Sequence, residues 1–193
     1  MIATKGFTWD LRSVFGNGQT KTCSFRPGET KRVDESKTAR NGLHCCENPF
    51  DCLSYYSMDG KNRFFRVEAA GDIDEDESGR IACTQITLLE ELTPFTFAME
   101  GMKYIINHPH RDRWEQRYHN VIVQQDEAEV KEKDAIAIAR GNDPVVKGAE
   151  GSILGLIVED ETGIVQCKLA VVSAEQAERW YRLNDRRELE EVR

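Results

Sequence analysis

The first half of the chain alternates short runs of Thr, Phe, Val and Ile with turn residues, a pattern typical of antiparallel β-sheets. In the run that begins at Asn62, Phe65, Val67 and Ala69 share one face of an extended chain. Phe64, Arg66 and Glu68 share the other face, which is the alternation of a half-buried strand. The pattern predicts strands at residues 2–7, 21–26, 30–34, 42–46, 62–73 and 81–90.

Two helix starts interrupt these strands. Asn48 followed by Pro49 is an N-cap and first-turn pair, which predicts a short helix over residues 49–56. Thr93 followed by Pro94 begins a longer helix that runs to about Ile106. Its apolar stripe is expected to pack on the β-sheet.

The composition changes after His108, where a polar and aromatic segment leads into an acidic stretch. Beyond it, apolar runs at residues 135–139, 152–158 and 164–172 predict more strands, and residues 181–192 fit a terminal hairpin. We therefore expect a β-rich α+β protein with a mainly antiparallel sheet, one short and one longer helix, and a smaller β-rich C-terminal part. The expected domains are an N-terminal α+β domain at 1–107, a charged connecting segment at 108–134 and a C-terminal domain at 135–193.

Charge is distributed unevenly along the chain, whose formal net charge is −8. Residues 1–66 carry 11 Lys and Arg against 7 Asp and Glu, whereas residues 67–193 carry 15 against 27. Phosphate backbones repel such a chain, so we do not expect direct nucleic-acid binding. The acidic surface instead suits a basic protein partner, for example one that itself binds nucleic acid.

The chain has no apolar run of about 18 residues, the length that spans a bilayer, and its start does not resemble a signal peptide. We therefore expect a cytoplasmic protein without membrane association. In that compartment its six cysteines are expected to be reduced thiols.

The candidate binding surfaces are three acidic segments, residues 72–77, 126–134 and 159–161, and one basic aromatic segment, residues 108–119. None has the spacing of a helix-loop-helix calcium site, and solvated turns are the alternative interpretation. The candidate binding residues are Asp72, Asp74, Glu75, Asp76, Glu77, Glu159, Asp160 and Glu161, with Arg111, Arg113 and Trp114 from the basic aromatic segment.

A cluster of His44, Cys45, Cys46 and Cys52 suggests zinc, because thiolates and imidazoles are its usual ligands. On a strand, however, His44 and Cys46 lie on one face and Cys45 lies on the other. The ligands would not converge, so no metal site is expected.

Three stretches resemble a known family. They are residues 5–8 (Lys-Gly-Phe-Thr), residues 41–56 with their continuation at 63–68, and residues 180–183 (Trp-Tyr-Arg-Leu). Together they resemble uncharacterised phage and prophage proteins with a Gly-Phe-His-Ala-Cys-Glu-Asn-Pro-Leu-Asp motif. Here Leu43 and Cys45 replace the usual Phe and Ala. The resemblance implies a phage origin and action inside a bacterial cell, and it assigns no catalytic residues.

Residues 135–139 and 147–148 also resemble one unit of the β-roll repeat of adhesin heads. Such units need neighbours to bury their faces, and only one or two are recognisable. We therefore do not expect an adhesin.

The order of elements is also similar in outline to ADP-ribosyltransferase folds, which use NAD. That similarity would make His44 or Lys5 the dinucleotide contact, Tyr55 and Tyr56 the stacking residues, and Glu90 or Glu91 the group that stabilises an oxocarbenium-like transition state. The usual sequence signatures of those enzymes are absent. We therefore favour a phage-encoded, inhibitor-like binding protein without a cofactor, which acts on a host or anti-phage defence protein, and keep the enzyme as the alternative.

Overall fold

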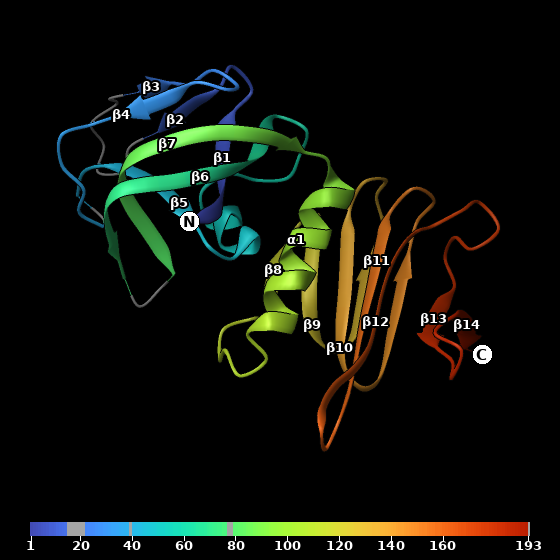
Figure 1. Cartoon of the computed structure of the whole chain (residues 1–193). Helices are drawn as coiled ribbons and strands as arrows, with labels where there is room; N and C mark the ends of the chain where they lie inside the picture. Colours follow the sequence, from blue (N-terminus) through green and yellow to red (C-terminus); the bar gives the residue numbers. More distant parts are fainter. Residues whose placement is uncertain (15–21, 39, 77–78, 193) are drawn as a thin grey trace. The chain divides into compact units, whose positions relative to one another are not determined.

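A computed structural model describes residues 1–14, 22–38, 40–76 and 79–192 (Figure 1). The chain divides into two compact units, Met1–Thr93 and Pro94–Arg193. Both are β-rich, and the described residues contain one 3₁₀ helix and one α-helix. The predicted fold class is confirmed. The longer helix belongs to the second unit, and the segment predicted as a charged connection contains two strands.

Every strand pair in the first unit is antiparallel. Its elements are β1 (Ile2–Thr8), β2 (Arg12–Val14), β3 (Thr22–Ser24), β4 (Thr30–Arg32), β5 (Leu43–Cys46), the 3₁₀ helix η1 (Pro49–Ser54), β6 (Asn62–Glu75) and β7 (Arg80–Leu92). Strand β1 pairs with β5 and β6, and β7 also pairs with both, so these four strands close into a ring. We call this ring the barrel. Strand β4 extends the sheet from β7, and β2 pairs with β3 separately.

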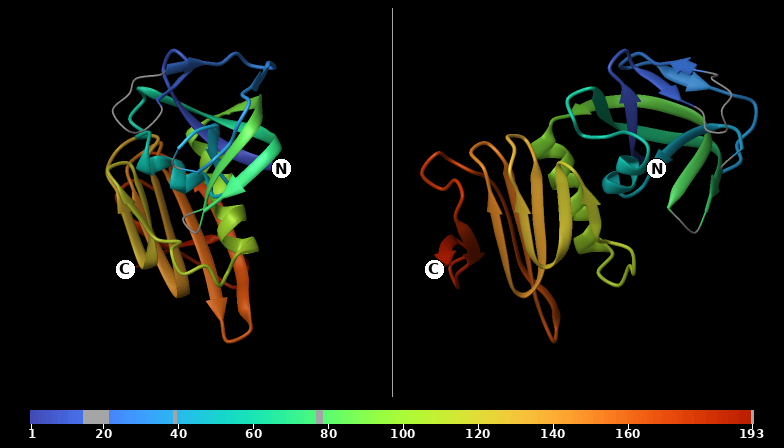
Figure 2. Two further views of the ribbon diagram at one scale, coloured as in Figure 1. Left: turned by 90° about the vertical axis from the view of Figure 1, so that its left-hand side faces the viewer. Right: turned by 180° about the vertical axis from the view of Figure 1, so that it is seen from behind.

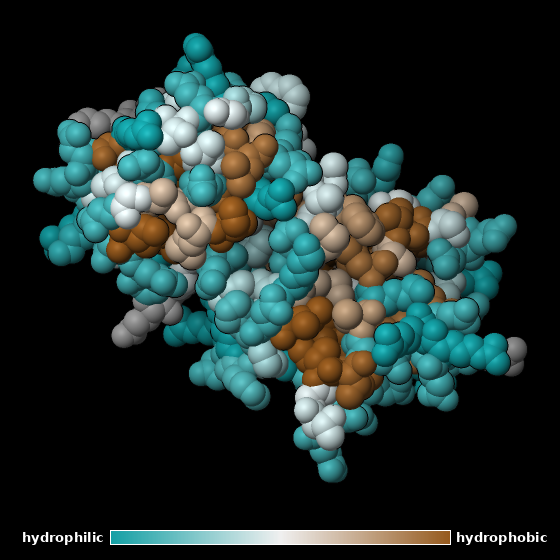
Figure 3. All heavy atoms as spheres, viewed as in Figure 1, coloured by the Kyte–Doolittle hydropathy of each residue, from teal (hydrophilic) through white to brown (hydrophobic). Residues whose placement is uncertain are grey.

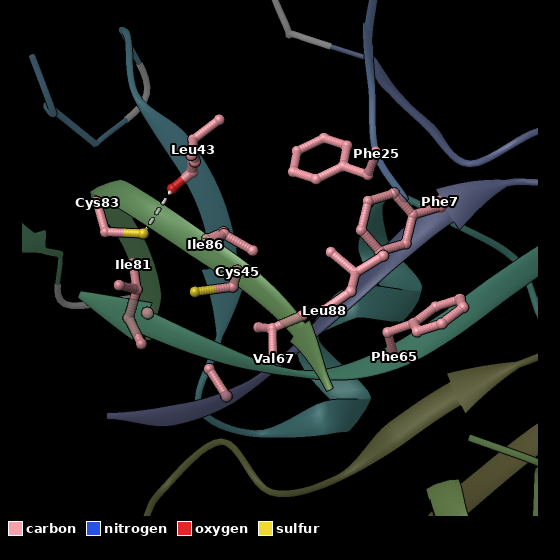
Figure 4. Packing of buried hydrophobic residues seen from close by; sticks show 12 residues of the cluster. Phe7, Phe25, Leu43, Cys45, Phe65, Val67, Ile81, Cys83, Ile86 and Leu88 are labelled. Carbon is pink, nitrogen blue, oxygen red and sulfur yellow. Dashed lines mark hydrogen bonds between the residues drawn. The ribbon is translucent and has the colours of Figure 1, made fainter. Parts of the chain in front are cut away.

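The ring encloses an aromatic and aliphatic core (Figure 4). Phe7 packs edge-on against Phe25 and Phe65, with ring centroids 5.0 and 5.7 Å apart. The predicted inward row of β6 is confirmed, because Phe65, Val67 and Ala69 are all buried. Cys45 and Cys83 lie on the other side of this core from the phenylalanines.

The short helix begins where the sequence predicts and ends earlier. The Asn48 side chain accepts a hydrogen bond from the Phe50 amide at 3.1 Å, which is the expected N-cap. The element is a 3₁₀ helix that ends at Ser54, since the Tyr55 amide bonds back to the carbonyl of Cys52. Its buried residues include Phe50 and Leu53.

The second unit combines one helix with a mixed sheet. Its elements are α1 (Pro94–Asn107), β8 (Gln116–Tyr118), β9 (Val121–Val130), β10 (Ile136–Gly148), β11 (Ile153–Asp160), β12 (Gly163–Val171), β13 (Trp180–Leu183) and β14 (Leu189–Val192). Strands β9, β10 and β11 are parallel neighbours: Val121, Ile136 and Ile153 lie side by side although they are 15 and 17 residues apart in sequence. The predicted C-terminal hairpin is confirmed as β13 and β14.

These parallel strands form stacked turns of a flattened coil. If β9 were straight, its ten residues would span about 30 Å at 3.3 Å per residue. The six peptide units from Val130 to Ile136 reach at most about 22 Å, so β9 has to bend to bring Ile136 back beside Val121. The bend falls at Asp126, whose φ is 61°, and the matching irregularity in β10 lies between Arg140 and Val145. We call each such turn of chain a rung.

The two surfaces of the coil differ. The inner surface is lined mainly by small and branched residues, Ala128, Ala137, Ala139, Val146, Leu154 and Leu156. On the outer surface α1 lies along the strands (Figure 2). At Gly155 the helix and the sheet pack closely, because a Cβ there would come within 2.8 Å of Met102 on α1 and 2.7 Å of Ile138. Helix α1 thus packs on the C-terminal sheet.

Candidate functional site

The first predicted acidic segment lies at the end of the β6–β7 hairpin. We call residues 72–76 the acidic hairpin end; its four acidic residues are Asp72, Asp74, Glu75 and Asp76, while Glu77 lies outside the described residues. Glu75 is exposed. Ile73 is 42% exposed and puts an apolar side chain among the carboxylates.

Hydrogen bonds hold two of these carboxylates in place. The amide and hydroxyl of Thr38 donate to Asp74 at 2.7 and 2.8 Å. The Ser36 hydroxyl donates to the Asp72 carboxylate at 3.1 Å. The two bonds from Thr38 lower the pKa of Asp74, which keeps this carboxylate ionised at neutral pH.

A chain of polar contacts runs from the acidic hairpin end to η1. The Arg80 guanidinium forms an ion pair with Asp76 at 2.8 Å and hydrogen-bonds the side chain of Tyr55. Burial raises the pKa of Tyr55, while Arg80 opposes that shift. Tyr55 remains 56% exposed, so this chain of contacts reaches the surface.

His44 lies close to these groups on β5. Burial lowers the pKa of its imidazole, and the positive charges of Lys5 and Arg80 lower it further. Its Nε2 atom is buried and has no hydrogen-bond partner among the residues that the structure describes. A buried imidazole between two cations is neutral at physiological pH.

Beneath His44 lies Lys5, whose ammonium group is buried in the barrel. Its Nζ donates to the His44 carbonyl at 2.6 Å and lies 5.3 Å from the centre of the Phe7 ring and 5.6 Å from that of Phe25. Burial lowers the pKa of Lys5, and the four neighbouring thiols Cys45, Cys46, Cys52 and Cys83 oppose the shift. Lys5 therefore ties β1 to β5 from within the core.

Of the residues of the NAD-binding alternative, Lys5 contacts His44, and Tyr55 shares the neighbour Arg80 with His44, whereas the glutamates lie elsewhere, on β7. His44 pairs with Ala82 on β7, and Glu90 lies eight residues further along that strand. Glu90 instead pairs with Arg66 at 3.1 Å, and Glu91 binds Arg63 through both carboxylate oxygens.

The two tyrosines of that alternative also have different surroundings. Tyr55 is exposed next to Arg80. The ring of Tyr56 lies against Gly6, where a Cβ would come within 2.5 Å of it. Tyr56 thus packs on β1, whereas Tyr55 faces solvent.

In the second unit, one of the predicted basic aromatic residues, Trp114, packs on a side chain that the sequence did not single out, Arg140. Arg140 is only 7% exposed and pairs with Glu159 at 2.8 Å. It also donates to the Pro109 carbonyl at 2.8 Å and lies 5.2 Å from the centre of the Trp114 ring. Arg140 thereby fastens the segment that follows α1 to the coil.

The other predicted residues of this unit have separate contacts. Arg111 lies over the Tyr104 ring at 5.1 Å, and Arg113 is exposed. The Thr162 amide and hydroxyl donate to Asp160 and lower its pKa, while Glu161 is exposed at the β11–β12 turn. Arg111, Asp160 and Glu159 therefore have intramolecular partners, and Arg113 and Glu161 face solvent.

Sequence reasoning missed Arg140, Arg80 and the Ser36–Thr38 contacts. A single arginine at the end of an apolar run, as at Arg140, was the available signal, because a buried arginine needs a carboxylate partner. Thr38 gave no such signal, since its partner is fixed by a loop contact 36 residues away in the sequence. Arg80 lies four residues from Asp76, but its contact with Tyr55 joins segments that are distant in the sequence.

In the described part of the chain, no group of three or more His, Cys, Asp or Glu side chains could hold a metal ion. No helix among these residues is long and apolar enough to cross a membrane.

Comparison with curated proteins and with solved structures gave no match. Comparison with protein families gave one, the domain of unknown function DUF7666, over residues 1–100. The match covers the whole first unit, including β5, η1 and the acidic hairpin end. It spans more than half of the sequence, so this chain belongs to the DUF7666 family.

Proposed function

We propose that this chain is a non-catalytic binding protein that presents the acidic hairpin end to a basic surface of another protein. In the phage setting that the sequence suggests, the partner is a host or anti-phage defence protein inside the bacterial cell. The observation that carries the proposal is the fixed arrangement of ionised carboxylates around the exposed Ile73.

Three features support this role. Asp72, Asp74 and Asp76 are held by Ser36, Thr38 and Arg80, so little conformational entropy is lost when a partner binds. Four carboxylates outnumber the positive charges of Arg80 and Lys37 at this end of the hairpin, which favours and steers a positively charged partner. Ile73 supplies apolar contact area at the centre of the charged surface, where binding energy usually concentrates.

The test is a comparison of three forms of the full chain. The binding variant carries Ile73→Ser and Glu75→Lys, two exposed positions whose side chains hold no contact in the hairpin described above. The control carries Glu29→Lys, an exposed charge reversal in the same unit, before β4. Each form is used to capture proteins from a bacterial lysate, and captured proteins are identified and their affinities measured by calorimetry.

We expect the wild type and the Glu29→Lys control to capture the same basic protein, and the Ile73→Ser/Glu75→Lys variant to bind it at least tenfold more weakly. The difference should shrink at high salt, because charge steering is screened. Equal capture and equal affinity for all three forms would contradict the proposal.

A further inference from the structure

The two units differ in whether the edge strands of their sheets are paired, and one edge strand of the second unit, β12, is unpaired on its outer side in the described chain. Each of the four ring strands of the barrel pairs with two others, whereas the C-terminal sheet ends at β12. The outer edge of β12 pairs with no strand of the described chain. An unpaired strand edge is a template for another strand.

The other sheet-ending strands among the described residues carry the features that usually prevent such pairing. Strands β2, β3, β4 and β8 have three residues each and β14 has four. The second part of β9 carries Glu127 and Glu129. Short edges and charged side chains both discourage edge-to-edge contact.

Strand β12 lacks these features. It has nine residues, Gly-Ile-Val-Gln-Cys-Lys-Leu-Ala-Val, of which only Lys168 is charged and none is proline. Val171 is 52% and Val165 is 40% exposed, and Cys167 is exposed as well. Figure 3 shows apolar residues on the surface of this unit beside α1. Strand β12 therefore combines free main-chain groups with exposed apolar side chains.

The strand is also complementary to itself in one register. Against β11 it pairs regularly from Gln166 to Val171, and the register changes next to Val165. In a symmetric antiparallel pair, one residue lies opposite its own copy on the two-fold axis. With Lys168 on the axis, two like charges would face each other, and with Cys167 there the irregular Val165 would have to pair.

With Leu169 on the axis, neither problem arises. Cys167 then lies opposite the partner copy's residue 171, a valine, and Lys168 lies opposite its residue 170, an alanine. The Lys168 ammonium donates to the Arg187 carbonyl at 3.0 Å, so its charge is directed toward the β13–β14 hairpin of its own chain. Residues 167–171 pair completely with their own copy.

We propose that two copies of this chain associate through their β12 edges, antiparallel and with Leu169 on the two-fold axis, so that two C-terminal sheets become one. Such a short edge-to-edge contact gives a dimer of modest affinity, to be measured at tens of micromolar protein. The occupant of the edge is a second copy because the strand matches itself in length, apolar pairing and charge.

The first experiment tests the charge pairing by sedimentation velocity. Ala170→Lys and Ala170→Glu change the same position and differ mainly in charge; each puts residue 170 opposite Lys168 of the other copy, twice per dimer. We expect the wild type to dimerise, Ala170→Lys to raise the dimer Kd about three- to tenfold, and Ala170→Glu to lower it. A monomeric wild type, or equal dimerisation of both variants, would overturn the proposal.

The second experiment tests the register by disulfide cross-linking in a Cys23→Ser background, since Cys23 is the other described cysteine that is not buried. Val171→Cys should cross-link two copies rapidly with diamide, which takes up the two thiol hydrogens as the residue 167–171 disulfide forms. Neither the background itself nor Val171→Cys/Cys167→Ser should do so, because like-numbered cysteines would lie about 13 Å apart in this register. Equal cross-linking of all three forms would rule the register out.

Discussion

The first unit closes its sheet into a ring with a core of large aromatic residues, whereas the second leaves its sheet open and stacks rungs lined with small residues. Closure satisfies the main chain without any partner, so the family-defining barrel can present polar surfaces such as the acidic hairpin end. Stacking leaves a last strand on each side, so the edges of the second unit must either be protected against pairing or pair with another strand. Different substitutions should therefore destabilise the two units. The barrel should be most sensitive to shortening of its core side chains, and the coil to enlargement of its small residues.

The largest effect is expected from truncating the barrel core. Phe65→Ala removes a ring that is 2% exposed and packs on Phe7, and it should lower the free energy of unfolding by about 3–5 kcal/mol. Phe65→Leu, which keeps most of the volume, is the milder control. Hydrogen exchange should show the loss of protection in β1 and β6 and not in β9–β11. An equal loss in both units would mean that they do not differ as described.

Enlarging a packed position in the second unit should cost less. Gly155→Ala places a methyl group within 2.8 Å of Met102 and should lower the free energy of unfolding by about 1–3 kcal/mol. Met102→Ala removes one of the clashing side chains. In chemical denaturation, the double variant should therefore be more stable than the sum of the two single changes predicts. Strict additivity would show that α1 does not press on Gly155.

The first unit should also make the stability of the protein depend on pH, through His44. The folded-state pKa of His44 is lowered from 6.5, so between that folded value and 6.5 the unfolded chain binds more protons than the folded one. The stability of the wild type therefore falls as the pH drops below 6.5, and the contribution levels off below the folded pKa. His44→Gln should lose less stability between pH 7.5 and pH 5.5, as measured by urea denaturation at each pH. A parallel pH profile for the variant would contradict the assignment.

The smallest effect is expected at the barrel surface. Glu91→Gln weakens the two-point contact with Arg63 and should lower the free energy of unfolding by about 0.5 kcal/mol. The Glu90→Gln control weakens the longer contact with Arg66 and should cost no more than that. Both losses should disappear in high salt during thermal denaturation, and a larger cost for Glu90→Gln would reverse the expected order.

Strong local patterns made the barrel predictable. The alternation through Phe65 and the Asn48 cap each depend on residues close in sequence, and both are confirmed. Strand β9 was missed because its acidic residues occupy outward positions and conceal the buried Val123 and Ala128 in what looked like a charged connection. The polarity of a segment thus did not reveal that its inward half was apolar.

The candidate site could be predicted only in part. The acidic residues were recognisable by composition, but their fixation by Thr38 depends on a loop that folds back over 36 residues. The separation of His44 from Glu90 depends on the register and length of β7, which no local pattern encodes. Contacts that depend on strand register can therefore be identified only in the structure, whereas the buried face of a strand and the N-cap of a helix can be predicted from the sequence.

The rungs of the second unit also set how this protein can change in length. Because Val121 and Ile136 occupy equivalent places 15 residues apart, a duplication of one such stretch inserts a turn of chain whose main-chain groups match both neighbours. Insertions of other sizes would leave donors and acceptors unmatched. Insertions and deletions in this unit should therefore comprise whole turns of the coil. The barrel is closed by its own strands, so its number of strands should stay constant.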